Sequence, residues 1–346
     1  MLTQKQTSGS VSDCVQPQYL GLAVMASLDR RWLLAVYLIV PATVLTIVLD
    51  HWVFGQILRV AILPVMPEQW PLWVIIFGLP HVVAGTLTMV DSDYLRHYRK
   101  QFILPLILYS TVALAGVLGP SLVRVLVPSW LGIYTIYHLL TQQIGLSFTM
   151  LRPSRLMLFW KWMILLTGFL LYAGVYVGAN IPDATIGGYD PYALCVIFSG
   201  SSLLLLTGSS FFLLKTVTAP VGARYLWANV AMIGSVFFAF VFGYTIFIVI
   251  IPRVIHDLTA FLIYANHDRN RNACTPHNYL YRLTQSLPLP FFLILPSISI
   301  TLAYLLQASH HWLFATIIYL LTFMHYHTEA IVWRRPNLHR QHLNFA

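Results

Sequence analysis

Long apolar stretches separated by short polar ones run along most of this chain. Each apolar stretch ends at charged residues or at glycine and proline. A helix needs roughly 20 predominantly apolar residues to cross the hydrocarbon core of a bilayer. The pattern therefore predicts membrane-spanning helices at about residues 32–49, 70–90, 101–118, 121–151, 157–177, 192–214, 287–306 and 312–333.

One further apolar stretch, residues 225–266, is too long for a single span. As one helix it would extend for roughly 63 Å, about twice the thickness of the hydrocarbon core. We expect two spans with a turn at residues 243–245, although Pro252 is a competing break. The chain then has ten spans.

Composition supports a membrane protein. Hydrophobic residues make up 58% of the 346 residues and charged residues only 9%. We predict an all-α polytopic transmembrane bundle of about 8–10 spans, with a polar N-terminal tail at 1–28, a single helical domain at 29–335 and an exposed cytoplasmic tail at 336–346.

The basic residues indicate the orientation of the chain. The net charge of +9 comes from short loops on one side of the predicted spans, such as the cluster Arg96, His97, Arg99 and Lys100. Basic residues concentrate in cytoplasmic loops, so both termini are expected in the cytoplasm. This pattern fits a bacterial inner-membrane protein surrounded by lipid, and it does not call for nucleic-acid binding.

Histidine is the unusual component, with 13 histidines against 11 acidic residues. Counting back from the basic end of each span places five histidines in one slab of the membrane, roughly 10–22 Å from the cytoplasmic boundary. A lone histidine on an apolar helix is ordinarily a hydrogen-bonded core residue. Five at one depth favour a shared metal ion, because one ion can bind several imidazoles. The predicted metal ligands are His81, His138, His256, His325 and His327.

Other polar residues accompany these histidines at helical spacing. Glu329 lies four residues after His325, and Gln142 lies four after His138, so each pair shares a helix face. Asp257 follows His256 and lies four residues after Arg253, which also permits a purely structural ion pair. We predict Glu329, Asp257 and Gln142 as catalytic or supporting residues.

The remaining histidines and cysteines suggest no further site. His339 and His342 have a spacing that can chelate a metal, but they fall in the predicted tail and are read as surface residues. Cys14, Cys195 and Cys274 have no paired spacing, so neither disulfides nor a thiolate site is expected.

Around these histidines the chain resembles the Brp/Blh family of integral-membrane β-carotene 15,15'-dioxygenases. The likeness lies in Gly78, Leu79, Pro80 and His81, in His138 with a following glycine, and in the histidines of later spans. The resemblance implies an all-helical fold with non-haem iron, held by His81, His138 and His256, that cleaves a carotenoid with O2. It leaves residues 324–335 unmatched.

The sequence thus predicts a non-haem iron oxygenase, with one or two iron ions, that acts with O2 on a long apolar substrate entering from the bilayer. A carotenoid, another isoprenoid or a lipid would fit, and oxidative double-bond cleavage is one expected reaction. A di-iron lipid desaturase or hydroxylase is an alternative, although the chain lacks the paired histidine boxes such enzymes carry. A metal or proton transporter using His256, Asp257, His325 and Glu329 as a relay is the other alternative.

Overall fold

The computed structural model describes residues 26–64, 78–180, 185, 187–273, 275–286, 289–309, 311–334 and 337–346. Nearly all of this part of the chain is helical. The α-helices are α1 (Arg30–Ala35), α2 (Ile39–Trp52), α4 (Leu79–Thr88), α5 (Ser92–Leu118), α6 (Ser121–Phe148), α7 (Arg155–Asn180), α8 (Pro191–Leu213), α9 (Pro220–Val241), α10 (Thr245–Arg271), α11 (Tyr279–Leu283), α12 (Phe291–Ala308), α13 (Trp312–Val332) and α14 (Leu338–Gln341). Short helices of other types cover Val36–Leu38, Leu58–Ile62 and Leu214–Thr216, and two short strands are β1 (Ser27–Leu28) and β2 (Asn344–Phe345).

Within the described residues, eight helices are long and apolar enough to cross a membrane. Large apolar side chains such as Leu104 and Leu204 point outward from them. The predicted all-α polytopic bundle is therefore confirmed. α13 is not among the eight, although it is 21 residues long, because two histidines and a glutamate lower its apolar content. The predicted span 70–90 lies partly outside the described residues, and α4 is its described part.

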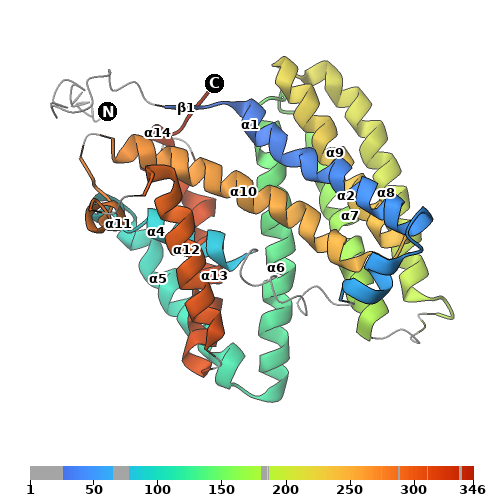
Figure 1. Ribbon diagram of the computed structural model, residues 1–346, viewed down its shortest axis with the longest axis horizontal. Helices are drawn as coiled ribbons and strands as arrows, with labels where there is room; N and C mark the ends of the chain where they lie inside the picture. The colour runs from blue at the N-terminus through green and yellow to red at the C-terminus, as the bar shows by residue number, and fades with distance from the viewer. Residues whose placement is uncertain are drawn as a thin grey trace.

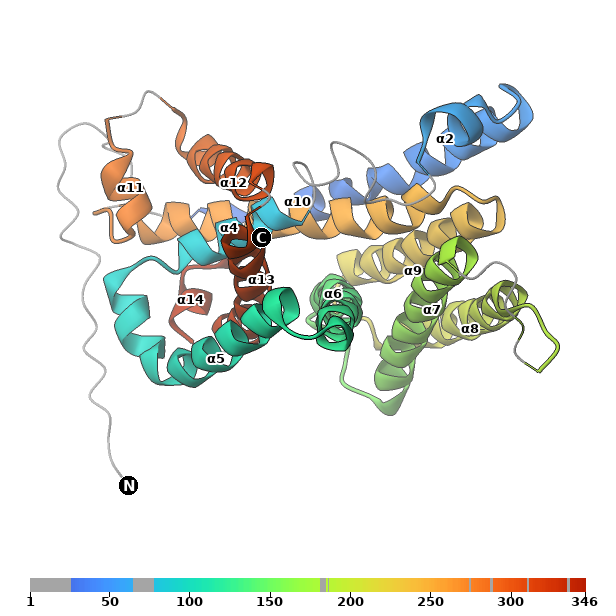
Figure 2. The ribbon, with the colours of Figure 1, turned by 90° about the horizontal axis from the view of Figure 1, so that it is seen from below.

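The helices form two groups joined by α6 and α10 (Figures 1 and 2). One group contains α2, α7, α8 and α9, and the other contains α4, α5, α12 and α13. α10 contacts members of both groups as well as α6. Its 27 residues extend for about 40 Å, and it crosses the molecule obliquely, as expected for a helix longer than the bilayer core is thick.

The turn between α9 and α10 lies where the sequence predicts it. α9 ends at Val241 and α10 begins at Thr245. Between them Gly243 has φ +75°, a backbone conformation that glycine adopts without steric cost. Pro252, the alternative position for the turn, lies inside α10, so the helix continues through this proline.

α4 is a short helix enclosed by others. Only ten residues long, it buries His81 and most of its other side chains against α10, α12 and α13. At about 15 Å it is too short to cross the bilayer, so it lies within the bundle and presents His81 to the interior.

The two ends of the described chain meet. β1 and β2 pair in parallel, with Ser27 opposite Asn344. Asn270, near the end of α10, accepts a hydrogen bond from the Ala26 N–H at 2.8 Å and donates to the His342 carbonyl at 2.9 Å. The predicted exposed tail at 336–346 is therefore wrong for its described part, because α14 and β2 pack against the bundle through contacts between distant residues.

The basic cluster at residues 96–100 also differs from its predicted place in a loop. It lies inside α5, which begins at Ser92. Asp91 caps that helix by accepting hydrogen bonds from the backbone of Asp93 and Tyr94. A strong N-cap starts the helix before the apolar run begins.

Candidate metal centre

Four helices bring their ionisable side chains together inside the bundle. His81 comes from α4, His138 from α6, His256 and Asp257 from α10, and His325 and Glu329 from α13. All six side chains are buried. Four of the five histidines that the sequence places at one depth thus meet in one cluster.

The four imidazoles form a closed ring of neighbours. The centroid of the His81 ring lies 4.8 Å from that of His256 and 4.7 Å from that of His325. His138 completes the ring, with its centroid 5.5 Å from His256 and 5.3 Å from His325. The Nε2 atoms of His81 and His256 are 3.2 Å apart.

Two overlapping sets of these side chains have the spacing of metal ligands. His81, His138 and His256 form one set, and His138, His325 and Glu329 form the other. In each set the candidate ligand atoms lie within 4.8 Å of one another. Because His138 belongs to both sets, they make one continuous cluster.

Several ligand atoms in the cluster lack hydrogen bonds although they are buried. They are His138 Nε2 and His325 Nε2, whereas His81 Nδ1 and Asp257 Oδ1, which also lack an aligned hydrogen bond, face each other at 2.9 Å. His138 Nε2 is 3.1 Å and His325 Nε2 is 3.5 Å from Glu329 Oε2, yet neither contact has hydrogen-bond alignment. Leaving buried polar atoms unpaired is costly, and a cation bound among these atoms would satisfy them. The residues therefore fit a metal ion.

Glu329 is held by neutral donors on its other sides. Gln142 donates to Oε2 and Tyr264 to Oε1, and the indole of Trp333 donates to Oε1 at 3.4 Å. These donors stabilise the charged carboxylate and fix its orientation toward His138 and His325. Gln142 thus lies where the sequence places it.

Asp257 orients the opposite side of the cluster. Its Oδ1 lies 2.9 Å from His81 Nδ1, and its Oδ2 accepts the Gly78 N–H at 2.9 Å. Arg253, one helical turn earlier, is 3.7 Å from the same Oδ2. A carboxylate beside the second nitrogen of an imidazole is the usual way in which a metal-binding histidine is oriented.

Two glycines permit the close approach of these helices. Gly78 has φ +89°, and a Cβ atom there would lie 1.6 Å from Nη2 of Arg253. A Cβ atom on Gly85 would lie 2.8 Å from His325 Nδ1 and 3.0 Å from the hydroxyl of Tyr264. A side chain at either position would displace a residue of the cluster.

His327 is not brought to the cluster. It lies on another face of α13, where its Nε2 is 3.2 Å from the carbonyl of Gln101, because residues two apart on a helix point in different directions. Sequence reasoning missed Tyr264 and Gly85. Both had a detectable signal: Tyr264 lies two turns after Asp257, and Gly85 lies one turn after His81.

A second histidine cluster lies nearer the end of α10. The ring of His339 stacks on Tyr94 and His267, with centroids 3.8 and 4.9 Å apart. Burial, together with the neighbouring His267, lowers the pKa of His339 to about 2. Burial likewise lowers the pKa of His342 to about 4. The prediction that His339 is a surface residue is wrong, since it is fully buried. Within the described residues, its ring nitrogens do not gather with other ligand atoms as those of the first cluster do.

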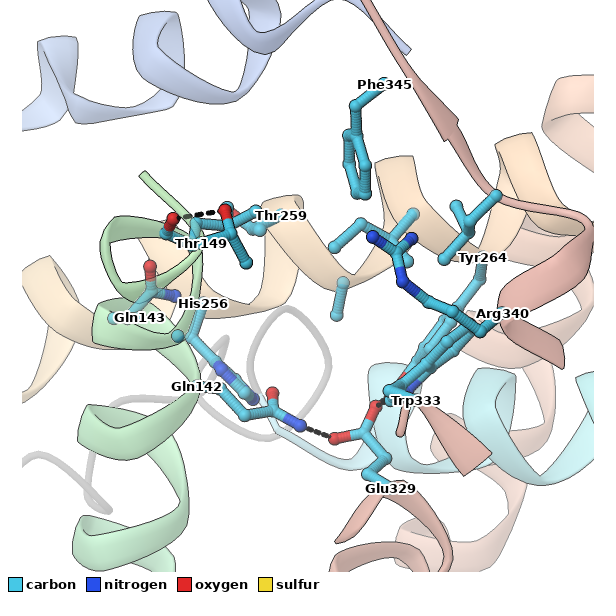
Figure 3. Close-up of a pocket in the computed structure, with 15 residues that line it drawn as sticks. Gln142, Gln143, Thr149, His256, Thr259, Tyr264, Glu329, Trp333, Arg340 and Phe345 are labelled. Atoms are coloured by element: carbon cyan, nitrogen blue, oxygen red, sulfur yellow. Dashed lines mark hydrogen bonds between the residues drawn. The ribbon is translucent and has the colours of Figure 1, made fainter. Parts of the chain in front are cut away.

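A cavity of about 290 Å³ lies beside the first cluster. His256 and Glu329 line it, together with Arg340, Leu343 and Phe345 of the C-terminal segment. Figure 3 shows Arg340 extending from the C-terminal segment toward the cavity, with Phe345 on one side of its guanidinium and Glu329 on the other. The walls come from α6 and α10.

Comparison of the chain with protein families, with curated proteins and with solved structures finds no match.

Proposed function

We propose that this chain is a membrane-embedded oxygenase in which histidines and a carboxylate hold non-haem iron, and which acts with O2 on an apolar substrate. The observation that carries the proposal is the buried set of His138, His325 and Glu329. Two histidines and one carboxylate with open positions are the typical ligands of non-haem Fe(II) oxygenases. His81 and His256 extend this set from the neighbouring helices.

Charge balance in the cluster also supports a bound cation. The described cluster holds two buried carboxylates, Asp257 and Glu329, and one guanidinium, that of Arg253, lies 3.7 Å from Asp257. The donors to Glu329 are neutral. A buried charge without a partner is strongly unfavourable, and a divalent ion beside Glu329 would supply one.

The protein side chains have separate tasks in this proposal. Bound iron would supply the redox chemistry that activates O2. Asp257 orients His81, whereas Gln142, Tyr264 and Trp333 hold Glu329 in place. The surrounding apolar helices exclude water, which protects reactive oxygen chemistry from side reactions. The resemblance favours a carotenoid or another isoprenoid as substrate, and double-bond cleavage as the reaction.

A metal or proton transporter is the second candidate, because buried histidines and acids also form relays. Arg253 beside Asp257 and Arg340 in the lining of the cavity place positive charge next to the path that a cation would follow. This arrangement favours the enzyme. A di-iron lipid desaturase is less well matched, since the cluster contains four histidines from four separate helices.

Metal analysis of the purified protein tests the proposal. We expect stoichiometric iron in the wild type and its loss in His138→Ala and His325→Ala, because each removes a ligand. His327→Ala is the matched control, two residues along the same helix and outside the cluster, and it should keep its iron. Wild-type protein that contains no transition metal after growth with iron would refute the proposal.

Activity is then tested as O2 consumption by the iron-loaded protein with carotenoid, isoprenoid and fatty-acyl substrates. Wild type and His327→Ala should consume O2 with one of these classes, and Glu329→Gln should not. Metal binding without O2 consumption, but with metal uptake into vesicles, would favour the transporter.

A further inference from the structure

A row of aromatic side chains leads away from the metal centre. Tyr264, whose hydroxyl donates to Glu329 Oε1, stacks on Trp333 with 5.9 Å between the ring centroids (Figure 3). Trp333 meets the ring of His267 edge-on at 5.8 Å, and His267 lies 5.8 Å from the ring of Tyr94. These are the spacings of aromatic rings in contact. The row therefore joins the buried cluster to the start of α5.

Tyr94, the last ring of this row, has a fixed acceptor for its proton. Its hydroxyl oxygen lies 3.0 Å from His267 Nε2, and His267 Nδ1 lies 2.8 Å from Asp268 Oδ1. All three residues are at most 1% exposed. A carboxylate only accepts hydrogen bonds, so the proton of the neutral imidazole lies on Nδ1. The lone pair of Nε2 then accepts the hydroxyl of Tyr94.

The surroundings of Tyr94 link the loss of an electron to the loss of this proton. Removing an electron alone would leave a positive charge on a buried ring, which is strongly unfavourable. Moving the proton to His267 leaves the ring neutral and places the charge beside the Asp268 carboxylate, which stabilises it. That carboxylate is held from its other side by the hydroxyl of Tyr281 at 3.0 Å from Oδ2. The three side chains are thus arranged for coupled transfer of an electron and a proton.

Tyr94 also lies within reach of molecules outside the bundle. Its two neighbours along the chain are exposed, Asp93 with 56% of its side chain and Leu95 with 47%. The basic residues at 96–100 follow, so this edge is on the expected cytoplasmic side. The row of rings therefore extends from the metal centre to a place where a soluble reductant can deliver an electron.

A centre that activates O2 benefits from such an outlet when no substrate is bound. Oxidising equivalents that meet no substrate attack the nearest side chains, and such side reactions are what an enclosed site must prevent. In this protein the nearest side chains include the histidine ligands. Tyrosine and tryptophan give up one electron more easily than the aliphatic side chains around them, so the row offers these equivalents an alternative path.

We propose that Tyr94, His267 and Asp268 form a redox-active tyrosine site, connected through Trp333 and Tyr264 to the metal centre, that removes oxidising equivalents when O2 reacts without substrate. This inference goes beyond the proposed function and rests on it, because O2 at the metal centre is the oxidant.

Each event transfers one electron and one proton. The electron passes from Tyr94 along the row to the metal centre, the O–H bond of Tyr94 breaks, and an N–H bond forms at His267 Nε2. A one-electron reductant of the cytoplasm then supplies an electron to the Tyr94 radical. The proton returns from His267, which restores the tyrosine and the neutral imidazole.

Freeze-quench electron paramagnetic resonance tests the path in the iron-loaded, full-length protein. The protein is mixed with hydrogen peroxide, which brings oxidising equivalents to the centre without substrate. We expect an organic radical signal that narrows when the protein carries ring-deuterated tyrosine and that decays when ascorbate is added as the reductant. Iron-loaded protein that gives no radical, or a radical unaffected by deuterated tyrosine, would overturn the proposal.

Variants locate the radical. Tyr94→Phe should lose the signal while keeping its iron, because phenylalanine retains the ring and lacks the hydroxyl. Tyr98→Phe is the matched control and should keep the signal. Tyr98 is a buried tyrosine one turn along α5 whose hydroxyl has no hydrogen-bond acceptor among the described residues. Trp333→Phe should delay the signal, because it replaces an easily oxidised ring of the row. A signal that persists in Tyr94→Phe would refute the assignment.

A photo-oxidant tests the tyrosine site in metal-free protein whose own cysteines are replaced. Arg96 is exposed and lies two residues from both Tyr94 and Tyr98, so a ruthenium–bipyridine label on Arg96→Cys favours neither by its position in the sequence. After a flash, the tyrosyl radical should form in the Tyr98→Phe protein and not in the Tyr94→Phe protein. It should form more slowly in D2O and in His267→Gln, because both changes hinder the proton transfer. Equal yields in the two tyrosine variants would overturn the role of His267.

The two proposals fail in different ways. If iron is bound and is lost in His138→Ala, but peroxide produces no radical at Tyr94, the metal centre stands and the path is wrong. If no metal binds but the flash oxidises Tyr94 with a D2O effect, the tyrosine site stands and the oxygenase proposal is wrong.

Discussion

Gly85 determines how closely α4 and α13 can approach. The helices meet where His325 Nδ1 passes the Cα atom of this glycine, and a Cβ there would come within 2.8 Å of the imidazole. Atoms this close must move apart, and His325 is confined by the other rings of the cluster. Adding a single methyl group at this position would therefore displace the imidazole of His325 from its place in the cluster.

We expect Gly85→Ala to weaken metal binding about tenfold. This is the lower end of the losses in metal affinity that follow when the orientation of a ligand is disturbed. Gly132→Ala is the control, since nothing lies within 4 Å of its added Cβ. Competition with a chelator of known affinity measures the effect. Wild-type affinity in Gly85→Ala would show that the cluster adapts to the added methyl group.

At the residue scale, the sequence predicts which residues could be metal ligands. It does not predict which other side chains those residues contact. Helical rise and the basic ends of the spans are sufficient to place His81, His138, His256 and His325 at one depth. Which face of each helix points inward depends on packing against distant helices. For that reason His327 could not be separated from His325, and Tyr264 was not identified.

At the scale of elements, the C-terminal segment is an integral part of the bundle. α14 and β2 supply Arg340 and Phe345 to the cavity, and α14 places His339 against Tyr94 and His267. Titratable groups near His339 include His267 and Arg271 from α10, His97 from α5, and His342. Protonating His339 in this position would add a positive charge among them.

Docking of this segment should weaken as pH falls. The pKa of His339 is about 2 when it is buried and about 6.5 when it is exposed, so the undocked state binds more protons between these values. The docked state is therefore fully favoured above pH 6.5 and loses about 2 kcal/mol by pH 5. The protection factors of the backbone amides at residues 338–345, which correct hydrogen exchange for its intrinsic pH dependence, should fall over that range.

His339→Gln tests this explanation, because glutamine is neutral throughout. The protection factors of residues 338–345 in this variant should depend much less on pH between 7 and 5. An unchanged pH dependence would assign the effect to another group, such as His342, whose pKa is lowered to about 4.

Element boundaries followed from the sequence where a local signal marks them. Gly243 and the length of the apolar run predicted the α9–α10 turn, and the Gly119–Pro120 turn between α5 and α6 is also read directly. Residues 337–346 have no apolar run and no long helix pattern. Their docking onto the bundle arises from pairing with β1 and from Asn270, contacts that no local pattern reveals.

At the scale of the whole molecule, several connections meet at one end. The α6–α7 and α8–α9 connections are joined by the bridge between Leu151 and Val217, and Tyr225 at the start of α9 donates to the Arg30 carbonyl at 2.8 Å. β1, β2 and the end of α10 meet at the same end (Figure 1). Basic residues of these segments make this the expected cytoplasmic side.

Cysteine labelling in intact cells checks this orientation, in a chain whose own cysteines are replaced. Tyr189→Cys, in the α7–α8 connection, should react with a membrane-impermeant maleimide. Lys215→Cys, in the α8–α9 connection, should react only after the cells are permeabilised. Both side chains are exposed, so the reverse pattern would mean that the orientation is inverted.

The contact between Gly78 and Asp257 has a consequence for biogenesis. These residues are 179 positions apart, so at roughly 5–20 residues per second the ribosome makes Asp257 on the order of ten to forty seconds after Gly78. During that interval α4 is too short to cross the bilayer by itself, and the helices that carry the partners of His81 have not all been synthesised. Assembly of the centre must therefore wait for the last helices, and a chain arrested before α13 would present unsatisfied imidazoles to the insertion machinery and to membrane proteases.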